Sequence, residues 1–235
     1  MIPFNRATQL VFRFCSALVG PVHNRGNCTI LALPTPVLYF PMEIMSGKPS
    51  PQATQALILA FVVYSLGVGY YAATRPNGQW RNPFSWHPFL MTVGMVGCMG
   101  IATITKKLGG YTNTKNHGIL GNLGVLLCLG GFYAIYRNKN LWGKEHFSTL
   151  HGKAGLALIV SSIGAGLVGG VFLHPDFGID KTNKTIRLAH KTFARVLLGG
   201  AWVTAFYGFY TMTQNPVDLA IFGLPLVVLA PFTLV

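Results

Sequence analysis

The chain has 235 residues, of which 51% are hydrophobic and only 10% are charged, and its mean hydropathy is +0.46. This composition is too apolar for an ordinary soluble domain, and the length is too short for several domains, so it predicts a membrane protein. Lys and Arg total 18 against five Asp and Glu, which gives a formal charge of +13. Because the basic residues lie between apolar segments, they indicate contact with anionic headgroups or a small anionic substrate, and not with nucleic acid.

Residues 1–50 are expected to form an N-terminal extension that is disordered or serves as a targeting segment. Three arginines precede the first acidic residue, Glu43, and an Arg-bearing, acid-poor start is typical of an organelle transit peptide. A disordered cytosolic tail, or a true start at Met45, fits the same residues. The membrane domain is expected to cover residues 54–235.

Six apolar segments of about 20 residues follow the extension, and each is long enough to cross a bilayer. In chain order, the expected spans are residues 54–73, 87–105, 117–136, 151–173, 190–212 and 217–235. The connections between them are short, so neighbouring spans should run in opposite directions.

The loops between spans alternate between the two faces of the membrane. Face A, as defined here, carries the loops at residues 74–86 and 137–150, and face B carries those at residues 106–116 and 174–189. Twelve of the 18 Lys and Arg residues lie on or next to face B, if those of the N-terminal extension (Arg6, Arg13, Arg25 and Lys48) and the first two of the fifth span (Lys191 and Arg195) are counted with its loops. The positive-inside rule therefore predicts that face B and the N-terminus are cytoplasmic. The membrane itself could be an endomembrane (endoplasmic reticulum, vesicle or vacuole) or the plasma membrane.

Four consecutive spans each begin with a histidine, namely His87, His117, His151 and His190. A histidine in hydrocarbon is costly and needs a partner, and binding a metal as a neutral imidazole is one of its few uses there. For any single one of them, an interfacial residue bonded to headgroups or water is the plainer interpretation. Four in the same register, with none at the start of the first and last spans, favour a metal site.

The alternating direction of the spans places His87 and His151 near face A, and His117 and His190 near face B. Two pairs of imidazoles near opposite faces of a four-helix bundle are what two bis-histidine haems require. Each helix contributes one histidine, so the second span pairs with the fourth and the third with the fifth. The sequence therefore predicts an all-α membrane protein with six transmembrane helices and a central four-helix bundle that holds two b haems.

The residues around these histidines resemble the successive signatures of the cytochrome b561 family, over about residues 54–235. The motifs are Ser85-Trp86-His87-Pro88-Phe89-Leu90-Met91, Lys115-Asn116-His117-Gly118, His146-Phe147-Ser148-Thr149-Leu150-His151-Gly152 and Ala189-His190-Lys191. Together they are specific, whereas none would be specific alone. The chain is most similar to the cytochrome b561 domain-containing subgroup, because His151-Gly152 stands where ascorbate-specific members usually have His-Ser-Trp.

The resemblance implies an oxidoreductase of the ascorbate-dependent transmembrane ferrireductase or monodehydroascorbate reductase type. His87 and His151 would be the axial iron ligands of the non-cytoplasmic haem b, and His117 and His190 those of the cytoplasmic haem b. Electrons would pass from cytoplasmic ascorbate to monodehydroascorbate or a ferric chelate on the other face. The haems carry this chemistry, so no catalytic side chain is assigned.

Four cations on face B are candidate ascorbate contacts. Lys115 occupies the K-x-H position of the family, and Lys184 stands where a basic residue recurs six positions before the histidine of the fifth span. Arg187 and Lys191 add to this group, and a cationic vestibule raises the local concentration of a monoanion. The other interpretation is that all four face lipid phosphates.

The acceptor side departs from the family pattern in two places. Lys139-Asn140 stands where ascorbate-using members tend to have a Phe-His pair, and Ile101-Ala102-Thr103 fills a stretch that often carries a glutamate. His146 is left as a candidate acceptor contact on face A. An alternative function is a haem-bearing membrane subunit that relays electrons for a protein partner, without a small-molecule site. A homodimer is left open.

Overall fold

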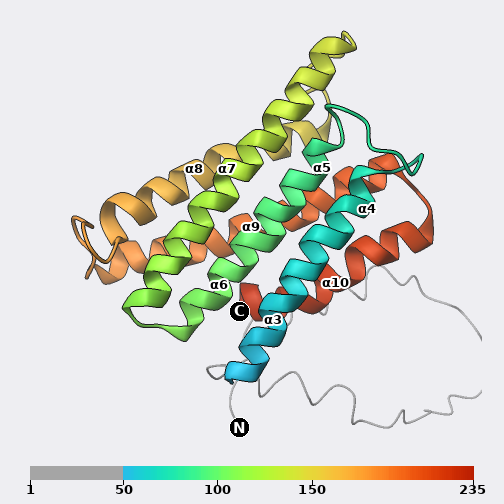
Figure 1. The fold of residues 1–235 in the computed structure, drawn as a ribbon. Helices are drawn as coiled ribbons and strands as arrows, with labels where there is room; N and C mark the ends of the chain where they lie inside the picture. Colours follow the sequence, from blue (N-terminus) through green and yellow to red (C-terminus); the bar gives the residue numbers. More distant parts are fainter. Residues whose placement is uncertain (1–49) are drawn as a thin grey trace, which may run out of the picture. The chain divides into compact units, whose positions relative to one another are not determined.

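The computed structural model describes residues 50–235, so the expectation for residues 1–50 falls almost wholly outside the described part. Within that part the chain is helical and contains no β-strand, which confirms the all-α class there. Six long helices follow one another, and the first two each consist of three consecutive pieces (Figure 1). The pieces are α3 (Pro51–Val63), η1 (Tyr64–Val68), α4 (Gly69–Ala73), α5 (Trp86–Met91), η2 (Thr92–Cys98), α6 (Met99–Leu108), α7 (Tyr111–Leu141), α8 (Leu150–Leu173), α9 (Lys184–Met212) and α10 (Pro216–Leu234).

Five of the six helices are long and apolar enough to cross a membrane. They are Pro51–Ala73, Trp86–Leu108, Tyr111–Leu141, Leu150–Leu173 and Pro216–Leu234. The remaining helix, α9, is 29 residues long, but its first half carries four basic residues and its second half is rich in Trp, Tyr and Phe. Its composition is therefore less apolar than that of the other five. The chain is a multi-pass integral membrane protein.

Two helices begin earlier than the apolar pattern suggested. Because α7 starts at Tyr111 and α9 at Lys184, His117 and His190 each lie in the second helical turn. His87 and His151 lie in the first turn of α5 and α8. The polar residues before His117 and His190 continue the helix outside the hydrophobic stretch, where hydropathy carries no helix signal.

The helix ends follow local sequence signals. Side-chain oxygens of Ser50, Thr149, Asn183 and Asn215 accept backbone N–H groups and cap α3, α8, α9 and α10. Between α6 and α7 the chain reverses through Gly109 and Gly110, whose φ angles are 72° and 84°. Other residues rarely adopt such angles, so this two-residue reversal depends on glycine.

The central bundle consists of two antiparallel helix pairs. One pair is α7 with the helix formed by α5, η2 and α6, and the other pair is α8 with α9. The first helix packs on α5, η2 and α6, and α10 packs on α9, as Figure 1 shows. The side chains of Phe61, Trp202 and Phe222 fill the core between these helices.

Two π-helical segments lie against each other inside this core. Segment η1 belongs to the first helix and η2 to the second, and a Cβ atom added to Gly97 of η2 would lie 2.6 Å from Ser65 Oγ of η1. The indole N–H of Trp202 donates to the carbonyl of Met95 in η2, with an N–O distance of 3.2 Å. A π-helical turn holds more residues than an α-helical turn, and it leaves carbonyls that such donors can satisfy.

Replacing Gly94 with alanine is expected to destabilise the contact between η2 and α7. A Cβ atom at Gly94 would lie 2.7 Å from the carbonyl oxygen of Gly124 and 2.7 Å from Cys128 Sγ. The backbone of α7 cannot yield locally, so we expect a loss of about 2 kcal/mol, measured as the fraction of monomeric detergent-solubilised protein left after heating. Gly164→Ala is the control, because its Cβ would meet nothing within 4 Å. Equal heat resistance of the two variants would contradict the close approach.

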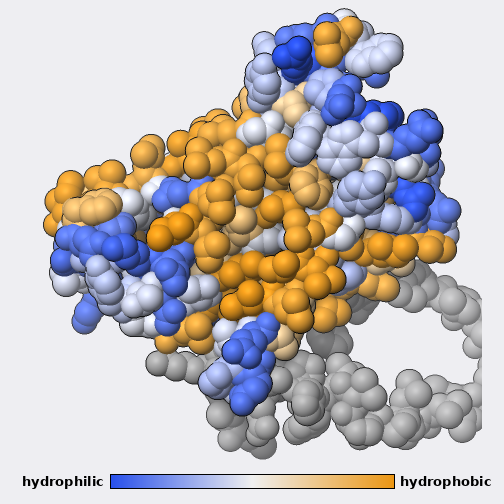
Figure 2. Space-filling model, viewed as in Figure 1, coloured by the Kyte–Doolittle hydropathy of each residue, from blue (hydrophilic) through white to orange (hydrophobic). Residues whose placement is uncertain are grey.

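On the face shown in Figure 2, hydrophobic side chains cover the middle of the molecule, and most hydrophilic ones gather toward its two ends. Large apolar residues on every long helix are exposed, for example Leu59, Leu126, Val160, Val203 and Val227. An apolar band this wide would be a liability in water, but it matches the hydrocarbon of a bilayer.

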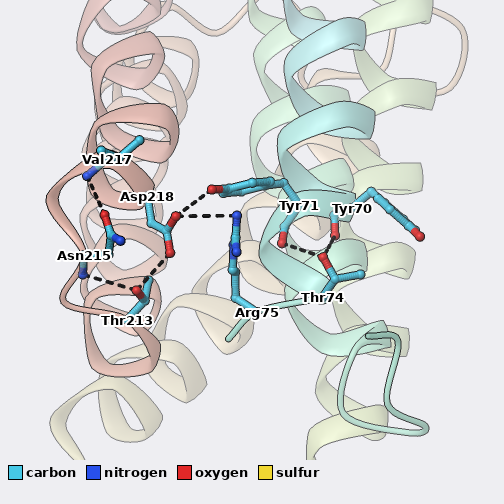
Figure 3. A network of polar contacts seen from close by, with 8 residues as sticks. All are labelled: Tyr70, Tyr71, Thr74, Arg75, Thr213, Asn215, Val217 and Asp218. Carbon is cyan, nitrogen blue, oxygen red and sulfur yellow. Dashed lines mark hydrogen bonds and ion pairs between the residues drawn. The ribbon is translucent and has the colours of Figure 1, made fainter. Parts of the chain in front are cut away.

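A polar network on face A joins the first helix to α10 (Figure 3). Asp218 accepts hydrogen bonds from Tyr71 (2.6 Å) and Thr213 (3.0 Å), and its carboxylate lies 3.5 Å from the guanidinium of Arg75. Arg75 also stacks over the ring of Tyr71, 3.9 Å from its centre. The three contacts of Asp218 tie together segments that are far apart in the sequence.

Candidate functional site

The structure brings the four span histidines together as two facing pairs. The ring centres of His87 and His151 are 6.1 Å apart, and the ring planes are inclined by 83°. Those of His117 and His190 are 6.3 Å apart, with an inclination of 89°. In both pairs one histidine comes from each antiparallel helix pair, so each site lies between the two halves of the bundle.

The spacing of the rings suits two imidazoles on one metal ion. Bonds from a metal to an imidazole nitrogen are about 2.0 Å, and each nitrogen lies about 1.1 Å from its ring centre, so two coaxial ligands have ring centres about 6 Å apart. Both observed distances agree with this value. Two protein ligands on opposite sides of a metal are what a porphyrin, with its four equatorial nitrogens, leaves to the protein.

Backbone carbonyls orient three of the four imidazoles. The Nδ1 atoms of the three lie 3.0 to 3.1 Å from carbonyl oxygens of the neighbouring antiparallel helix: His87 from Gly131, His117 from Ala102 and His151 from Thr204. Donation of Nδ1–H to a carbonyl fixes the tautomer in which Nε2 is free to bind a metal. Within the described part of the chain, Nδ1 of His190 is buried and has no hydrogen-bond partner.

A cavity of about 230 Å³ extends from the His87–His151 pair toward face A. Gly155 lines it, and a Cβ atom at this position would meet nothing within 4 Å. Its walls are mostly apolar, with Phe132, Phe147 and Phe209 among them. An apolar cavity with a glycine gap beside two facing imidazoles fits a porphyrin.

Open space also lies on the helices near the His117–His190 pair. A Cβ atom at Gly118 or Gly121 would meet nothing within 4 Å. A wider crevice of about 520 Å³ lies between α7 and α8, and Gly166 and Gly170 line it. These two glycines flank Gly169, which packs against the ring of His190. The crevice therefore lies close to the second pair, but neither of its two histidines lines it.

Lys115 is engaged in an exposed ion pair. Its ammonium lies 3.2 Å from a carboxylate oxygen of Asp176 in the loop after α8, and the hydroxyl of Tyr111 donates to the same carboxylate. The hydrogen bond from Tyr111 and the charge of Lys115 hold the pKa of Asp176 below its ordinary value, so the pair stays ionised at neutral pH. Residues two apart on a helix do not face each other, so Lys115 points away from the side of α7 that bears His117.

The other three predicted cations are exposed on α9. Lys184 is its first residue, Arg187 donates a hydrogen bond to the carbonyl of Lys181, and Lys191 follows His190. The structure adds a cation that sequence reasoning missed. The ammonium of Lys106, at the end of α6, donates to the hydroxyl of Thr114 in α7 over 2.7 Å, which places a further cation at the face B end of the bundle. In the sequence, the only sign of this cation was the Lys106-Lys107 pair at the end of the second span. The positive-inside rule explains that pair equally well, so it did not point to a site.

On face A, His146 and Lys139 line the mouth of the cavity. The Nε2 atom of His146 lies 2.7 Å from Asn140 Oδ1, and its ring stacks on Tyr136 with ring centres 4.1 Å apart. The ammonium of Lys139 donates to the carbonyl of Glu145 over 2.8 Å. The residues that depart from the family motif therefore hold the loop after α7 against the helix end.

The fold and the two histidine pairs together define a multi-pass membrane protein of the haem-binding, electron-transferring class. The sequence profile for eukaryotic cytochrome b561 matches residues 86–215, which is more than half of the chain. The chain therefore belongs to the cytochrome b561 family, as its motifs indicated. Membership of this family implies haem b.

Curated relatives carry the name transmembrane reductase CYB561D2. The chain is 33% identical to the protein of Bos taurus, 32% identical to that of Mus musculus and 33% identical to that of Homo sapiens, in each case over 129 residues. The match covers 50% of this chain and 58% of each relative. The chain is thus an oxidoreductase-family protein similar to transmembrane reductases over a little more than half of their length.

Proposed function

We propose that this protein carries electrons across a membrane, from cytoplasmic ascorbate to monodehydroascorbate or ferric iron on the other side. The observation that carries the proposal is the facing of two imidazoles near each end of the bundle, with ring centres 6.1 Å and 6.3 Å apart. Haem, when bound, supplies one-electron chemistry. His87 with His151, and His117 with His190, would be the axial ligands of two haem b groups.

The two pairs would divide the thickness of the membrane between them. Thr204, whose carbonyl contacts His151, follows His190 by 14 residues along α9, which corresponds to about 21 Å at the rise of an α-helix. This arrangement requires α9, the fifth of the six long helices, to cross the membrane as well. We place face B, which carries more Lys and Arg, in the cytoplasm of an endomembrane or of the plasma membrane.

Cations on face B would collect the anionic donor. Lys106, Lys184, Arg187 and Lys191 lie at this end of the bundle, and their summed charge raises the local concentration of a monoanion. Lys115 would contribute less, because Asp176 neutralises it. On face A, His146 and Lys139 at the cavity mouth are the groups available to an anionic acceptor or iron chelate.

Spectroscopy of the purified protein tests the proposal. We expect a b-type α-band in the reduced-minus-oxidised spectrum, two haems per chain, and rapid reduction when ascorbate is added on face B of reconstituted vesicles. A protein without a b-type band would contradict haem binding. Haem that stays oxidised with ascorbate, but is reduced by a stronger chemical reductant such as dithionite, would favour the alternative of a subunit that relays electrons for a protein partner.

Neutralising Lys106 is expected to weaken the response to ascorbate more than neutralising Lys115. One unit charge about 4 Å to 10 Å from an anion is worth on the order of 1 kcal/mol in a partly wet site, so Lys106→Gln should raise the half-saturating ascorbate concentration about fivefold. The effect should shrink at high ionic strength. Lys144→Gln on face A is the control, and an equal effect of this variant would contradict a donor site on face B.

A further inference from the structure

Each antiparallel helix pair of the bundle exchanges histidine contacts in a fixed register. In α7 the carbonyl that accepts from His87 belongs to Gly131, which follows the helix's own histidine, His117, by 14 residues. In α9 the carbonyl that accepts from His151 belongs to Thr204, which follows His190 by the same 14 residues. Fourteen residues make about four turns, so each acceptor lies on nearly the same side of its helix as the histidine.

The second helix keeps this register by means of its π-helical segment. The carbonyl that accepts from His117 belongs to Ala102, which follows His87 by 15 residues. Segment η2 lies between the two, and a π-helical turn accommodates one residue more than the α-helical turn it replaces. Because of this extra residue, Ala102, which is 15 positions after His87, takes the same place relative to its helix's histidine as Gly131 in α7 and Thr204 in α9, which are 14 positions after theirs.

Two antiparallel helices in contact are related by an approximate twofold axis. If His151 of α8 reaches the residue 14 positions after His190, then His190 of α9 should reach the residue 14 positions after His151. That residue is Ala165 of α8. Among the described residues, Nδ1 of His190 is buried and unpartnered, so the one vacant donor of the four imidazoles stands where the register assigns an acceptor.

Glycine occupies equivalent positions in α8 and α9, 18 residues or five turns after each histidine. A Cβ atom at Gly208 of α9 would lie 2.4 Å from Cε1 and 2.7 Å from Nδ1 of His151. A Cβ atom at Gly169 of α8 would lie 3.2 Å from Cε1, 3.8 Å from Nε2 and 4.0 Å from Nδ1 of His190, so here Nε2 is the nearer nitrogen. Each imidazole ring thus fits into a gap, called a notch here, that the missing side chain of a glycine leaves in the neighbouring helix. Gly208 lies one turn after Thr204, and Gly169 lies one turn after Ala165. The ring of His190 lies farther from its glycine than the ring of His151 does.

We propose that the carbonyl of Ala165 is the acceptor for Nδ1–H of His190, and that Gly169 and Gly208 are positioning residues that admit the two imidazoles to their notches. This inference rests on the proposed function, because it concerns the ligands of the two haems. It makes the four imidazoles equivalent: each donates to the main chain of its antiparallel neighbour, and each keeps Nε2 for the iron. The two ring planes of each site are thereby held at a steep angle.

The hydrogen bond can be tested on the unmodified protein. With haem bound and reduced, low-spin bis-histidine iron is diamagnetic, so imidazole Nδ1–H protons are observable by NMR of a sample labelled with ¹⁵N-histidine. We expect four slowly exchanging Nδ1–H signals from the haem ligands. Three such signals in a protein with two haems would overturn the inference and leave the proposed function standing. A protein that binds no haem would overturn both.

Variants of the notches give a second test. Gly169→Ala should raise the midpoint potential of the His117–His190 haem alone, because a lost Nδ1–H bond makes the imidazole a weaker donor to ferric iron. Gly208→Ala should affect the His87–His151 haem alone and more severely, as a shifted potential and a changed ferric EPR anisotropy, or as loss of that haem. Gly164→Ala in α8 and Gly199→Ala in α9 are the controls, because added Cβ atoms there meet nothing closer than 3.5 Å. Potentials and EPR signals that match these controls would overturn the positioning role.

Discussion

Replacing His117 with alanine is expected to reduce the haem content from two per chain to about one and to abolish rapid reduction by ascorbate. Without His117, His190 has no second imidazole opposite it, so the site can no longer bind a haem through two histidines. This pair lies near face B, where ascorbate is proposed to donate its electron. The pyridine haemochrome assay gives the haem content, and stopped-flow absorbance at the α-band gives the rate.

The matching variant on the other face should behave differently. His87→Ala is also expected to lose one haem, but fast partial reduction should remain, because the site next to the ascorbate-facing cations is intact. His174→Ala controls for the loss of a histidine as such, since its ring stacks on Phe177 in the loop after α8 and belongs to neither pair. Indistinguishable kinetics of His117→Ala and His87→Ala would contradict the assignment of the two pairs to opposite faces.

Replacing Asp218 with alanine is expected to cost about 3 kcal/mol of stability, because three hydrogen-bond or charge contacts are lost together and partly buried donors are left without an acceptor. The donors are Tyr71, Thr213 and Arg75, and Asp218 itself is 8% exposed. The network joins the first helix to α10, so its loss should release the two outer helices from the bundle. Heating the detergent-solubilised protein and following the monomer fraction measures this loss.

A double-mutant cycle separates the ion pair from the rest of the network. Arg75→Gln, Asp218→Asn and the double variant should show a coupling energy of about 1 kcal/mol, because the pair is partly shielded from water. Haem content should stay near the wild-type value in Arg75→Gln, since Arg75 contacts neither histidine pair. Strict additivity of the two single variants would mean that the carboxylate acts through its hydrogen bonds and not through its charge.

The histidine register was readable because it depends only on position along the chain. Crossing hydrocarbon requires about 20 apolar residues, so the beginning of each span, and the face on which it lies, follow from counting. For the same reason the sequence pointed to His87 facing His151 and His117 facing His190. The helix ends were less accessible, since α7 and α9 extend through polar residues that carry no hydropathy signal.

The sequence by itself determined the all-α membrane class, the family and the four histidines, because burial in lipid and helix direction are local properties of the chain. The tertiary structure alone decided which carbonyls orient His87, His117 and His151, that Lys106 contacts Thr114 at the face B end of the bundle and that Asp176 engages Lys115. Contacts between helices depend on the direction in which each side chain points from the helix axis, and this direction changes by about 100° from one residue to the next. One extra residue in η2 therefore redirects every side chain beyond it, and spacing in the sequence does not reveal that residue.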